Sequence, residues 1–308
     1  MDTTLLFVQF LNGMQLGVLL FLLAAGLSLT FGIMDLVNLA HGSLYMVGAF
    51  ICASLTFWTG SFVLAVLLAI PLIALVGLAT EYIVIRHLYA RDHLDHVLAT
   101  FGLILCFDTL VQLIWGSEGI AVPLPGWLDG QVELFAGIVF PTFRLLIILA
   151  GLAIAAGLYF LVNFTRLGML IRAGASNRTM VSALGINIQL LFALVFSLGA
   201  ALAGIAGMLI SPISEASIGM GNQIIITAFV VIVIGGVGSM KGAFIAAMLI
   251  GLIDTFGRAY LDTIFKLVMS PVAAETSAPA VSAMLIYLLM AIVLAVRPQG
   301  LFPPKARS

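Results

Sequence analysis

The sequence predicts an all-α polytopic membrane protein, a bundle of about eight or nine transmembrane helices with one short helix on its cytoplasmic side. Of the 308 residues, 63% are hydrophobic and only 8% are charged, whereas soluble proteins carry roughly 25% charged residues. The hydrophobic residues also gather in runs of about twenty, the length that crosses the hydrocarbon core of a bilayer. We therefore expect residues 1–308 to form a single transmembrane domain.

Eight apolar runs long enough to span a membrane follow one another along the chain. They lie near residues 5–27, 62–85, 95–115, 141–163, 188–212, 222–240, 242–261 and 280–296. A shorter run at about 43–58 follows a polar interruption, so it is either a ninth span or a re-entrant segment. The sequence also allows two structures for the glycine-rich turn at 235–242, a hairpin or a broken helix. No internal repeat is visible in the residue spacing.

The positions of Lys and Arg predict the orientation, because cytoplasmic loops of membrane proteins carry an excess of both. Nine of the twelve lie at residues 86–91 and 166–178, at Lys241 and in the C-terminal tail. Placing these segments in the cytoplasm leaves an outer loop, 117–140, with three acidic residues. The C-terminus is then cytoplasmic, and nine spans would put the N-terminus outside.

Several functional classes find no support in the sequence. The formal net charge of −1 gives no electrostatic footprint for nucleic acid. No HExxH, GxSxG or Cys/His metal spacing occurs, so neither an enzyme nor a metal site is predicted. His87, His93 and His96 lie close together, and a solvated loop explains them better than a metal site does. The segment IGGVGSMKG lacks the order of a phosphate-binding loop and lies between apolar runs.

The segment from Thr165 to Ile188 interrupts the apolar pattern with three arginines, Arg166, Arg172 and Arg178. An arginine in the middle of a bilayer costs roughly 2.5–3.5 kcal/mol, so this segment is expected to lie in water. Within it, Ser176 is a suitable N-cap and Gly185 a suitable residue after a C-cap.

The helix between these two residues has about nine residues, too few to be stable alone in water. Met180, Val181 and Leu184 form an apolar stripe on it. The stripe therefore needs a surface, either the protein's own membrane domain or a soluble partner. An ordinary positive-inside loop is the alternative.

Polar residues within the apolar runs are candidates for a solute pathway, because such residues usually face a bundle interior or a watery cavity. Asn38 and His41 lie where the run breaks before residue 43, and Asp108 lies inside a span. Asn38 and His41 also suit a purely structural role, in which they cap a helix break. Asp254 precedes Arg258 by four residues, the spacing of an ordinary helical ion pair.

Small residues indicate where helices approach closely. Gly199, Ala203 and Gly207 recur at four-residue spacing, a pattern that allows helix backbones to touch in lipid. We expect these three residues to pack against a neighbouring helix.

Several motifs, in order, resemble the branched-chain amino acid ABC transporter permeases of the Liv type. They are LSLTFGIMDLVNLAHGSLYMVGAF, EYIVIR, LATFGL, TRLGMLIRAGASNRTMVSALGIN, LVFSLGAALAGIAGML, VIGGVGSMKGAF and VRPQGLF. The resemblance covers nearly the whole chain. It implies a multi-pass subunit of the bacterial cytoplasmic (inner) membrane that is not itself an enzyme.

The same resemblance implies several partners for this chain. They are a second homologous permease, two cytoplasmic ATPase subunits that bind ATP and Mg, and an extracytoplasmic solute-binding protein. The chain itself would bind no cofactor. The segment 164–188 resembles the family's ATPase-coupling region, and Arg172 and Arg178 are expected to pair with groups on the ATPase. The coupling residues implied are Arg166, Gly168, Arg172, Ala173, Asn177, Arg178, Ala183 and Gly185.

Two functions remain open beside a permease for branched-chain or related amino acids. One is a urea or short-amide ABC importer, since related permeases share these motifs. The other is a secondary transporter or channel that works alone, for which Asp108 and Asp254 are the candidate ion-coupling residues. An intramembrane enzyme would need clustered acid/base residues, which the sequence lacks.

Overall fold

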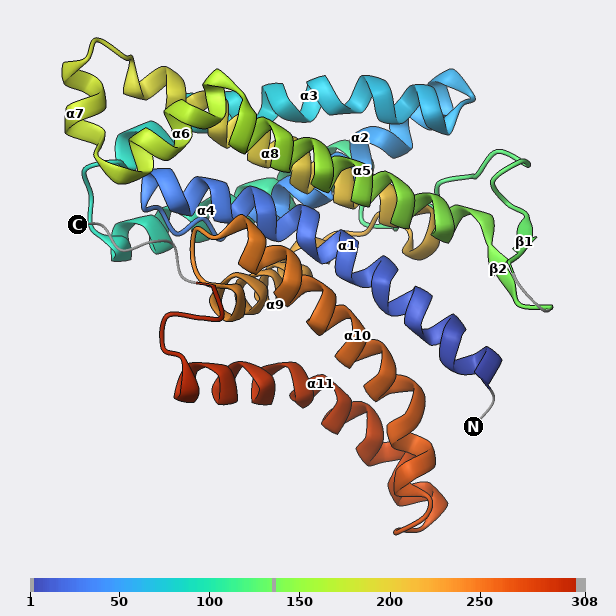
Figure 1. The fold of residues 1–308 in the computed structure, drawn as a ribbon. Coiled ribbons are helices and arrows are strands. Elements are labelled where there is room, and N and C mark those ends of the chain that lie inside the picture. The colour runs from blue at the N-terminus through green and yellow to red at the C-terminus, as the bar shows by residue number, and fades with distance from the viewer. Residues whose placement is uncertain (1–2, 135–136, 303–308) are drawn as a thin grey trace.

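The computed structural model describes residues 3–134 and 137–302, which are almost entirely helical (Figure 1). The helices are α1 (Thr3–Met34), α2 (His41–Thr59), α3 (Phe62–Ile83), the 3-10 helix η1 (Ile85–Leu88), α4 (His93–Trp115), α5 (Thr142–Phe164), α6 (Arg166–Ser176), α7 (Arg178–Ala183), α8 (Ile188–Ser214), α9 (Met220–Gly235), α10 (Met240–Phe265) and α11 (Pro271–Val296). The outer loop adds a two-stranded antiparallel sheet, β1 (Gln131–Glu133) with β2 (Val139–Pro141).

Eight helices in the described ranges are long and apolar enough to cross a membrane, which confirms the predicted polytopic bundle. The uncertain run at 43–58 forms α2, a helix of 19 residues, so it belongs to these eight. The run at 222–240 instead forms the shorter α9, with 16 residues. The first run extends beyond residue 27 to Met34, which makes α1 32 residues long.

Helix α1 lies at the centre of the molecule, and α4 and α11 lie at its surface. In its most apolar stretch, 83% of α1 is buried, against 17% of α4 and 11% of α11. The exposed helices present large apolar side chains such as Leu113 and Leu288. A bilayer would cover such surfaces, since helices with internally satisfied backbones are stable in lipid.

Helices α1 and α2 touch α8 and α9 through glycines. A β-carbon added to Gly26 of α1 would lie 2.7 Å from the Gly199 carbonyl oxygen of α8, and one added to Gly199 would lie 3.1 Å from the Gly26 oxygen. The starts of α2 and α9 meet in the same reciprocal way, at Gly42 and Gly221, with distances of 2.3 and 2.1 Å. At both places only a residue without a side chain lets the two backbones approach so closely.

Small residues allow α8 to lie against α2. A β-carbon on Gly207 would come within 2.0 Å of the Tyr45 carbonyl oxygen. Ala203, one turn earlier, is completely buried, and Gly199 lies beside the His41 ring. A larger side chain at Gly207 would force the two backbones apart.

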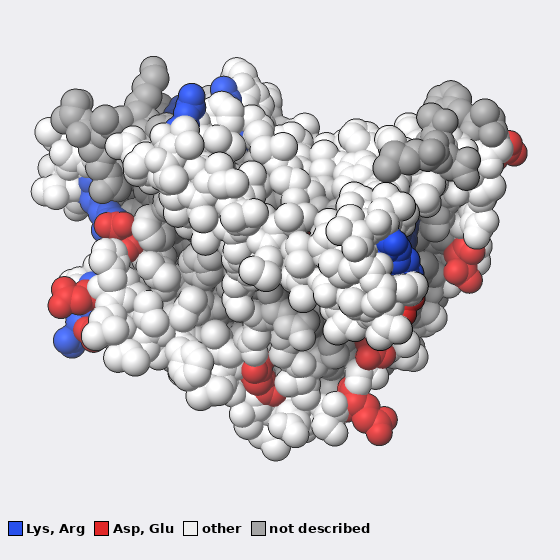
Figure 2. Space-filling view, turned by 90° about the horizontal axis from the view of Figure 1, so that it is seen from below, with Lys and Arg blue, Asp and Glu red and all other residues white. Residues whose placement is uncertain are grey.

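The two ends of the bundle differ as the orientation predicts. Figure 1 places α6, α7 and the end of α11 on one side of the molecule, and the start of α1 with β1 and β2 on the opposite side. On the face seen in Figure 2, most charged side chains lie towards the two ends and the middle is mostly uncharged. The three arginines of 166–178 lie on α6 and α7, so the positive-inside pattern makes this end the cytoplasmic one.

Candidate functional site

The arginine-rich segment after α5 forms two helices, α6 and α7, rather than one. The prediction that Ser176 caps a single helix is wrong. The Thr165 side chain accepts a hydrogen bond from the Gly168 N–H at 3.1 Å and caps α6, and the Asn177 side chain accepts one from the Met180 N–H at 2.9 Å and caps α7. Asn177 has an extended backbone, so the chain turns sharply there. Gly185 follows α7 with a φ of 84°.

The apolar stripe of α7 is divided between two surfaces. Val181 is buried against the protein, whereas Met180 and Leu184 are 59% and 73% exposed. Ala183 is exposed beside them. Large apolar side chains that are exposed together outside the bilayer are typical of a surface that contacts another protein.

Helix α6 is fastened to the end of α5. A β-carbon on Gly168 would lie 2.2 Å from the Val162 carbonyl oxygen, so the two helices touch through their backbones. The Arg172 guanidinium donates a hydrogen bond to the same carbonyl. A displacement of α6 must therefore move the cytoplasmic end of α5 with it. Among the other predicted coupling residues, Arg166 is exposed and Ala173 is half-buried.

Helix α7 contacts the base of α8 through Arg178. The guanidinium carbon of Arg178 lies 5.6 Å from the centre of the Phe192 ring, within the range of a cation–π contact. The Tyr89 ring also packs against Phe192 in an edge-to-face arrangement, with the two ring centroids 4.9 Å apart. The segment after α3 is thereby joined to the coupling segment.

Asn38 and His41 are fully buried at the break between α1 and α2. The His41 ring faces the Leu23 backbone and lies against Gly26. Neither ring nitrogen, and neither polar atom of Asn38, makes a hydrogen bond of ordinary geometry within the described residues. This burial favours the structural role for both residues, and their place on a pathway stays a prediction.

Asp108 joins two helices. Its carboxylate accepts a hydrogen bond from the Asn222 side chain at 3.1 Å, which joins α4 to α9. Asp254 and Arg258 form the i,i+4 ion pair that their spacing suggests, at 2.9 Å.

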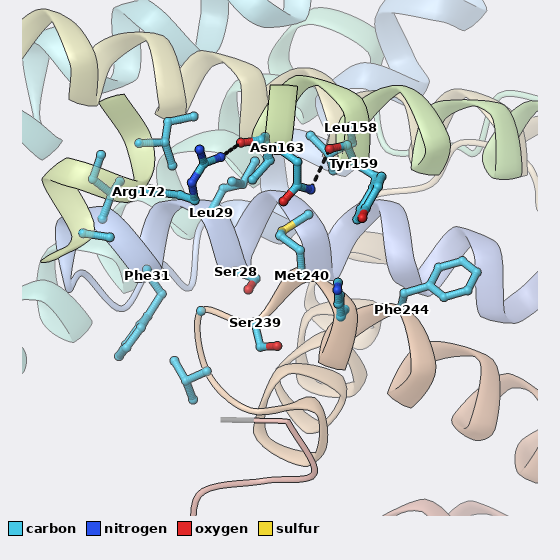
Figure 3. Close-up of a pocket in the computed structure, with 18 of the residues that line it drawn as sticks. Ser28, Leu29, Phe31, Leu158, Tyr159, Asn163, Arg172, Ser239, Met240 and Phe244 are labelled. Atoms are coloured by element: carbon cyan, nitrogen blue, oxygen red, sulfur yellow. Dashed lines mark hydrogen bonds between the residues drawn. The ribbon is translucent and has the colours of Figure 1, made fainter. Parts of the chain in front are cut away.

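A groove of about 1130 Å³ lies in the half of the bundle that carries α6 (Figure 3). Helices α1, α5, α6 and the start of α10 form its walls. Its deeper part is apolar, with Phe21, Leu152 and Phe244, and its polar residues lie mainly towards the cytoplasm. These polar residues are Ser28, Asp35, Tyr159, Asn163, Arg172, Ser176, Ser239 and Lys241.

Close contacts with α1 limit the groove at the end away from α6. A β-carbon on Gly151 of α5 would collide with the Val18 side chain of α1, at 1.7 Å. On the other wall, a β-carbon on Gly251 of α10 would lie 2.5 Å from the Gly17 nitrogen of α1. The groove therefore ends where α5 and α10 pack against α1.

Sequence reasoning missed the residues of this groove. The apolar runs contain single polar residues at Ser28, Tyr159 and Asn163. Lys241 was used only to predict the orientation of the chain in the membrane. They converge through the packing of α1 against α5 and α10, which no short-range pattern reveals. In the sequence, Ser28 was recognisable only as one residue of a hydrophobic span.

No group of His, Cys, Asp and Glu side chains in the described ranges could hold a metal ion. Of the three clustered histidines, His96 is buried and its Nε2 lies 2.9 Å from the Leu88 carbonyl oxygen. This contact accounts for its position without a ligand.

The long apolar helices, the groove between α1, α5 and α10 and the helix pair at one end of it define a multi-pass membrane protein of the transport type. Residues 9–294 match the family described as branched-chain amino acid transport system / permease component, and the chain belongs to this family.

Three relatives illustrate the range of similar proteins. The high-affinity branched-chain amino acid transport system permease protein LivH of Escherichia coli is 31% identical over 283 residues, which cover 85% of this chain and 89% of that protein. BraD of Pseudomonas aeruginosa, which carries the same description, is 31% identical over 84% of this chain and 88% of its own. The probable branched-chain amino acid transport permease protein LivH of Methanocaldococcus jannaschii is 30% identical, covering 80% and 79%. No solved structure matches the chain.

Proposed function

We propose that this chain is the membrane permease subunit of an ATP-driven importer for branched-chain amino acids in the bacterial cytoplasmic membrane. The observation that carries the proposal is the groove between α1, α5 and α10, which has α6 at one end. A groove with an apolar wall and a few polar groups suits a small amphipathic solute. The family to which the chain belongs supports the same substrate class.

In this proposal the groove is the cytoplasmic half of the pathway, and a second homologous permease covers its open side. Two ATPase subunits bind ATP and Mg and contact α7 at Met180 and Leu184, which are exposed. Since Arg172 and Gly168 fasten α6 to Val162, movement of the ATPases would shift the end of α5 and reshape the groove. An extracytoplasmic binding protein delivers the solute to the outer face.

The experiment is uptake into proteoliposomes that contain this chain with its neighbouring ATPases, second permease and binding protein. We expect leucine, isoleucine and valine to accumulate in the vesicles only when ATP and all partners are present. Urea should not accumulate. Uptake by this chain alone, driven by an ion gradient, would establish a secondary carrier instead. Preferred uptake of urea would establish the short-amide importer.

A further inference from the structure

A second pocket lies at the extracytoplasmic end of α8, away from the groove between α1, α5 and α10. Helix α8 begins beside α7 at the cytoplasmic end and ends at Ser214, and the chain then continues through residues 215–219 into α9. A pocket of about 290 Å³ lies at this junction, where α2 packs against α8 and α9. None of the described residues that line it belongs to the groove.

Glu215 has an unusual backbone conformation at this pocket. Its φ of 53° and ψ of 156° lie close to a region that is essentially restricted to glycine. The next residue, Ala216, holds the chain in place, because it exchanges two backbone hydrogen bonds with Ile120 of the outer loop, at 2.8 and 2.9 Å. Strained residues that the surrounding structure holds in this way gather at binding sites.

The Glu215 carboxylate is placed but not paired. A β-carbon added to Gly119 would lie 2.7 Å from one of its oxygens, so the carboxylate rests on the backbone of the outer loop. The ion pairs found in the described residues do not include it. The start of α9 adds a partial positive charge of roughly half a unit, which the full negative charge of Glu215 outweighs.

Tyr45 brings a second unpaired polar group to the pocket, from α2. The residue is 6% exposed and lines the pocket. Its hydroxyl makes no hydrogen bond within the described residues, and the oxygen stays accessible. Because the hydroxyl of a buried tyrosine usually has a hydrogen-bond partner, an occupant of the pocket would supply the one that Tyr45 lacks.

We propose that this pocket binds a primary ammonium group carried on an alkyl chain. An ammonium group donates three hydrogen bonds, and three side chains in the lining can accept them. The acceptors are the Glu215 carboxylate, the Tyr45 hydroxyl and the side-chain oxygen of Gln223. The apolar lining for the alkyl chain consists of Ile218, Met220 and Ile224.

A bare metal ion fits this lining less well. Hard cations such as Ca²⁺ take six or more oxygen ligands, whereas the described lining offers a single carboxylate beside apolar side chains. Two sources share the alkylammonium chemistry, a free alkylamine and a lysine side chain of a protein at the outer face. The proposal goes beyond the proposed function, because it concerns a separate site at the opposite end of the bundle.

The first test measures which charge the pocket selects, in the full chain reconstituted in proteoliposomes. Ser217→Cys, at a half-buried position in the lining, is made with Cys106→Ser, which leaves only the buried Cys52. We expect aminoethyl methanethiosulfonate, a cation, to react about tenfold faster than the anionic sulfonatoethyl reagent, relative to their rates with free cysteine. Glu215→Gln should remove this preference, and Glu133→Gln, exposed on β1 outside the pocket, should retain it.

The second test is protection of the same cysteine against an uncharged maleimide. We expect n-butylamine to slow the labelling, and n-butanol, which has the same chain without the charge, to have no effect. Tyr45→Phe should raise the n-butylamine concentration for half-maximal protection by about tenfold, as loss of a hydrogen bond to a charged group does. The thermal midpoint should not change, because this hydroxyl has no partner in the described protein. Tyr287→Phe, on α11 outside the pocket, is the matched control.

The solute-binding protein distinguishes the two sources of the ammonium group. Protection by the native binding protein that is lost when its lysines are acetylated would identify a lysine side chain as the occupant. Protection by n-butylamine but not by the binding protein would identify a free amine. Both results support the ammonium site.

Three results would overturn the ammonium site. They are equal reaction with the two charged reagents, an unchanged preference in Glu215→Gln, and equal protection by n-butanol and n-butylamine. Faster reaction with the anionic reagent would instead show an anion site at the start of α9. None of these measurements involves leucine uptake, so a failure of uptake would overturn the proposed function and leave the pocket assignment standing.

Discussion

The carboxylate of Glu81 and the guanidinium of Arg86 form a two-pronged ion pair where α3 ends, with N–O distances of 3.1 and 3.3 Å. The Tyr89 hydroxyl donates a further hydrogen bond to the same carboxylate. The pair raises the pKa of Arg86 above its ordinary value. Glu81 is completely buried, so its charge depends on these two partners.

We predict that Glu81→Ala destabilises the protein by about 1–3 kcal/mol, because it leaves the half-buried Tyr89 hydroxyl without its acceptor and Arg86 without its ion pair. The thermal midpoint of the protein in detergent measures the effect. Glu81→Ala combined with Arg86→Met should recover part of the loss. An unchanged midpoint for Glu81→Ala would show that solvent already screens the pair.

Substitution of Gly207 should disturb helix packing. In Gly207→Ala the new methyl group would lie 2.0 Å from the Tyr45 carbonyl oxygen, so α2 and α8 must separate, at about 1–3 kcal/mol for an overpacked contact. We expect a lower thermal midpoint and a lower yield of folded protein.

Gly157→Ala on α5 is the matched control, since a β-carbon there meets nothing within 4 Å. Alanine is the better helix former by about 1 kcal/mol, so this variant should be as stable as the native chain or slightly more so. Equal behaviour of the two variants would contradict the close packing of α8.

The helices could be predicted from the sequence because hydrophobic length alone identifies a membrane span. The break before α2 was also visible, since Asn38 and His41 interrupt an apolar run. Its geometry was not visible, because His41 packs against Gly199, which lies more than 150 positions away in the sequence.

The coupling segment was predicted in position and was wrong in detail. Three arginines exclude residues 166–178 from lipid, which places the segment outside the membrane. Ser176 and Asn177 are both good caps by residue type, and the choice between them depends on tertiary contacts. In the structure α6 packs against Val162 and continues through Ser176. Asn177 then caps α7.

His41→Ala tests whether this buried ring is structural. Its removal leaves a cavity between α1 and α8, for which buried side chains typically cost about 2–5 kcal/mol. We expect a lower thermal midpoint, with an unchanged leucine KM in the transporters that fold. A native midpoint with an altered KM would instead place His41 on the pathway.

Leu184→Asp tests the contact with the ATPase. Leu184 is 73% exposed at the end of α7 and has no lipid to cover it on the cytoplasmic side, so a charge there should leave insertion intact and disrupt an apolar contact with another protein. We expect the variant to reach the membrane normally and to co-purify at least tenfold less ATPase, which corresponds to about 1.4 kcal/mol. Arg172→Glu should act in the same direction, because it also releases α6 from the end of α5.

Leu94→Asp, at an equally exposed leucine at the start of α4, is the control and should retain the ATPase. Full recovery of the ATPase with Leu184→Asp would mean that α7 is an ordinary loop helix and that the coupling contact lies elsewhere.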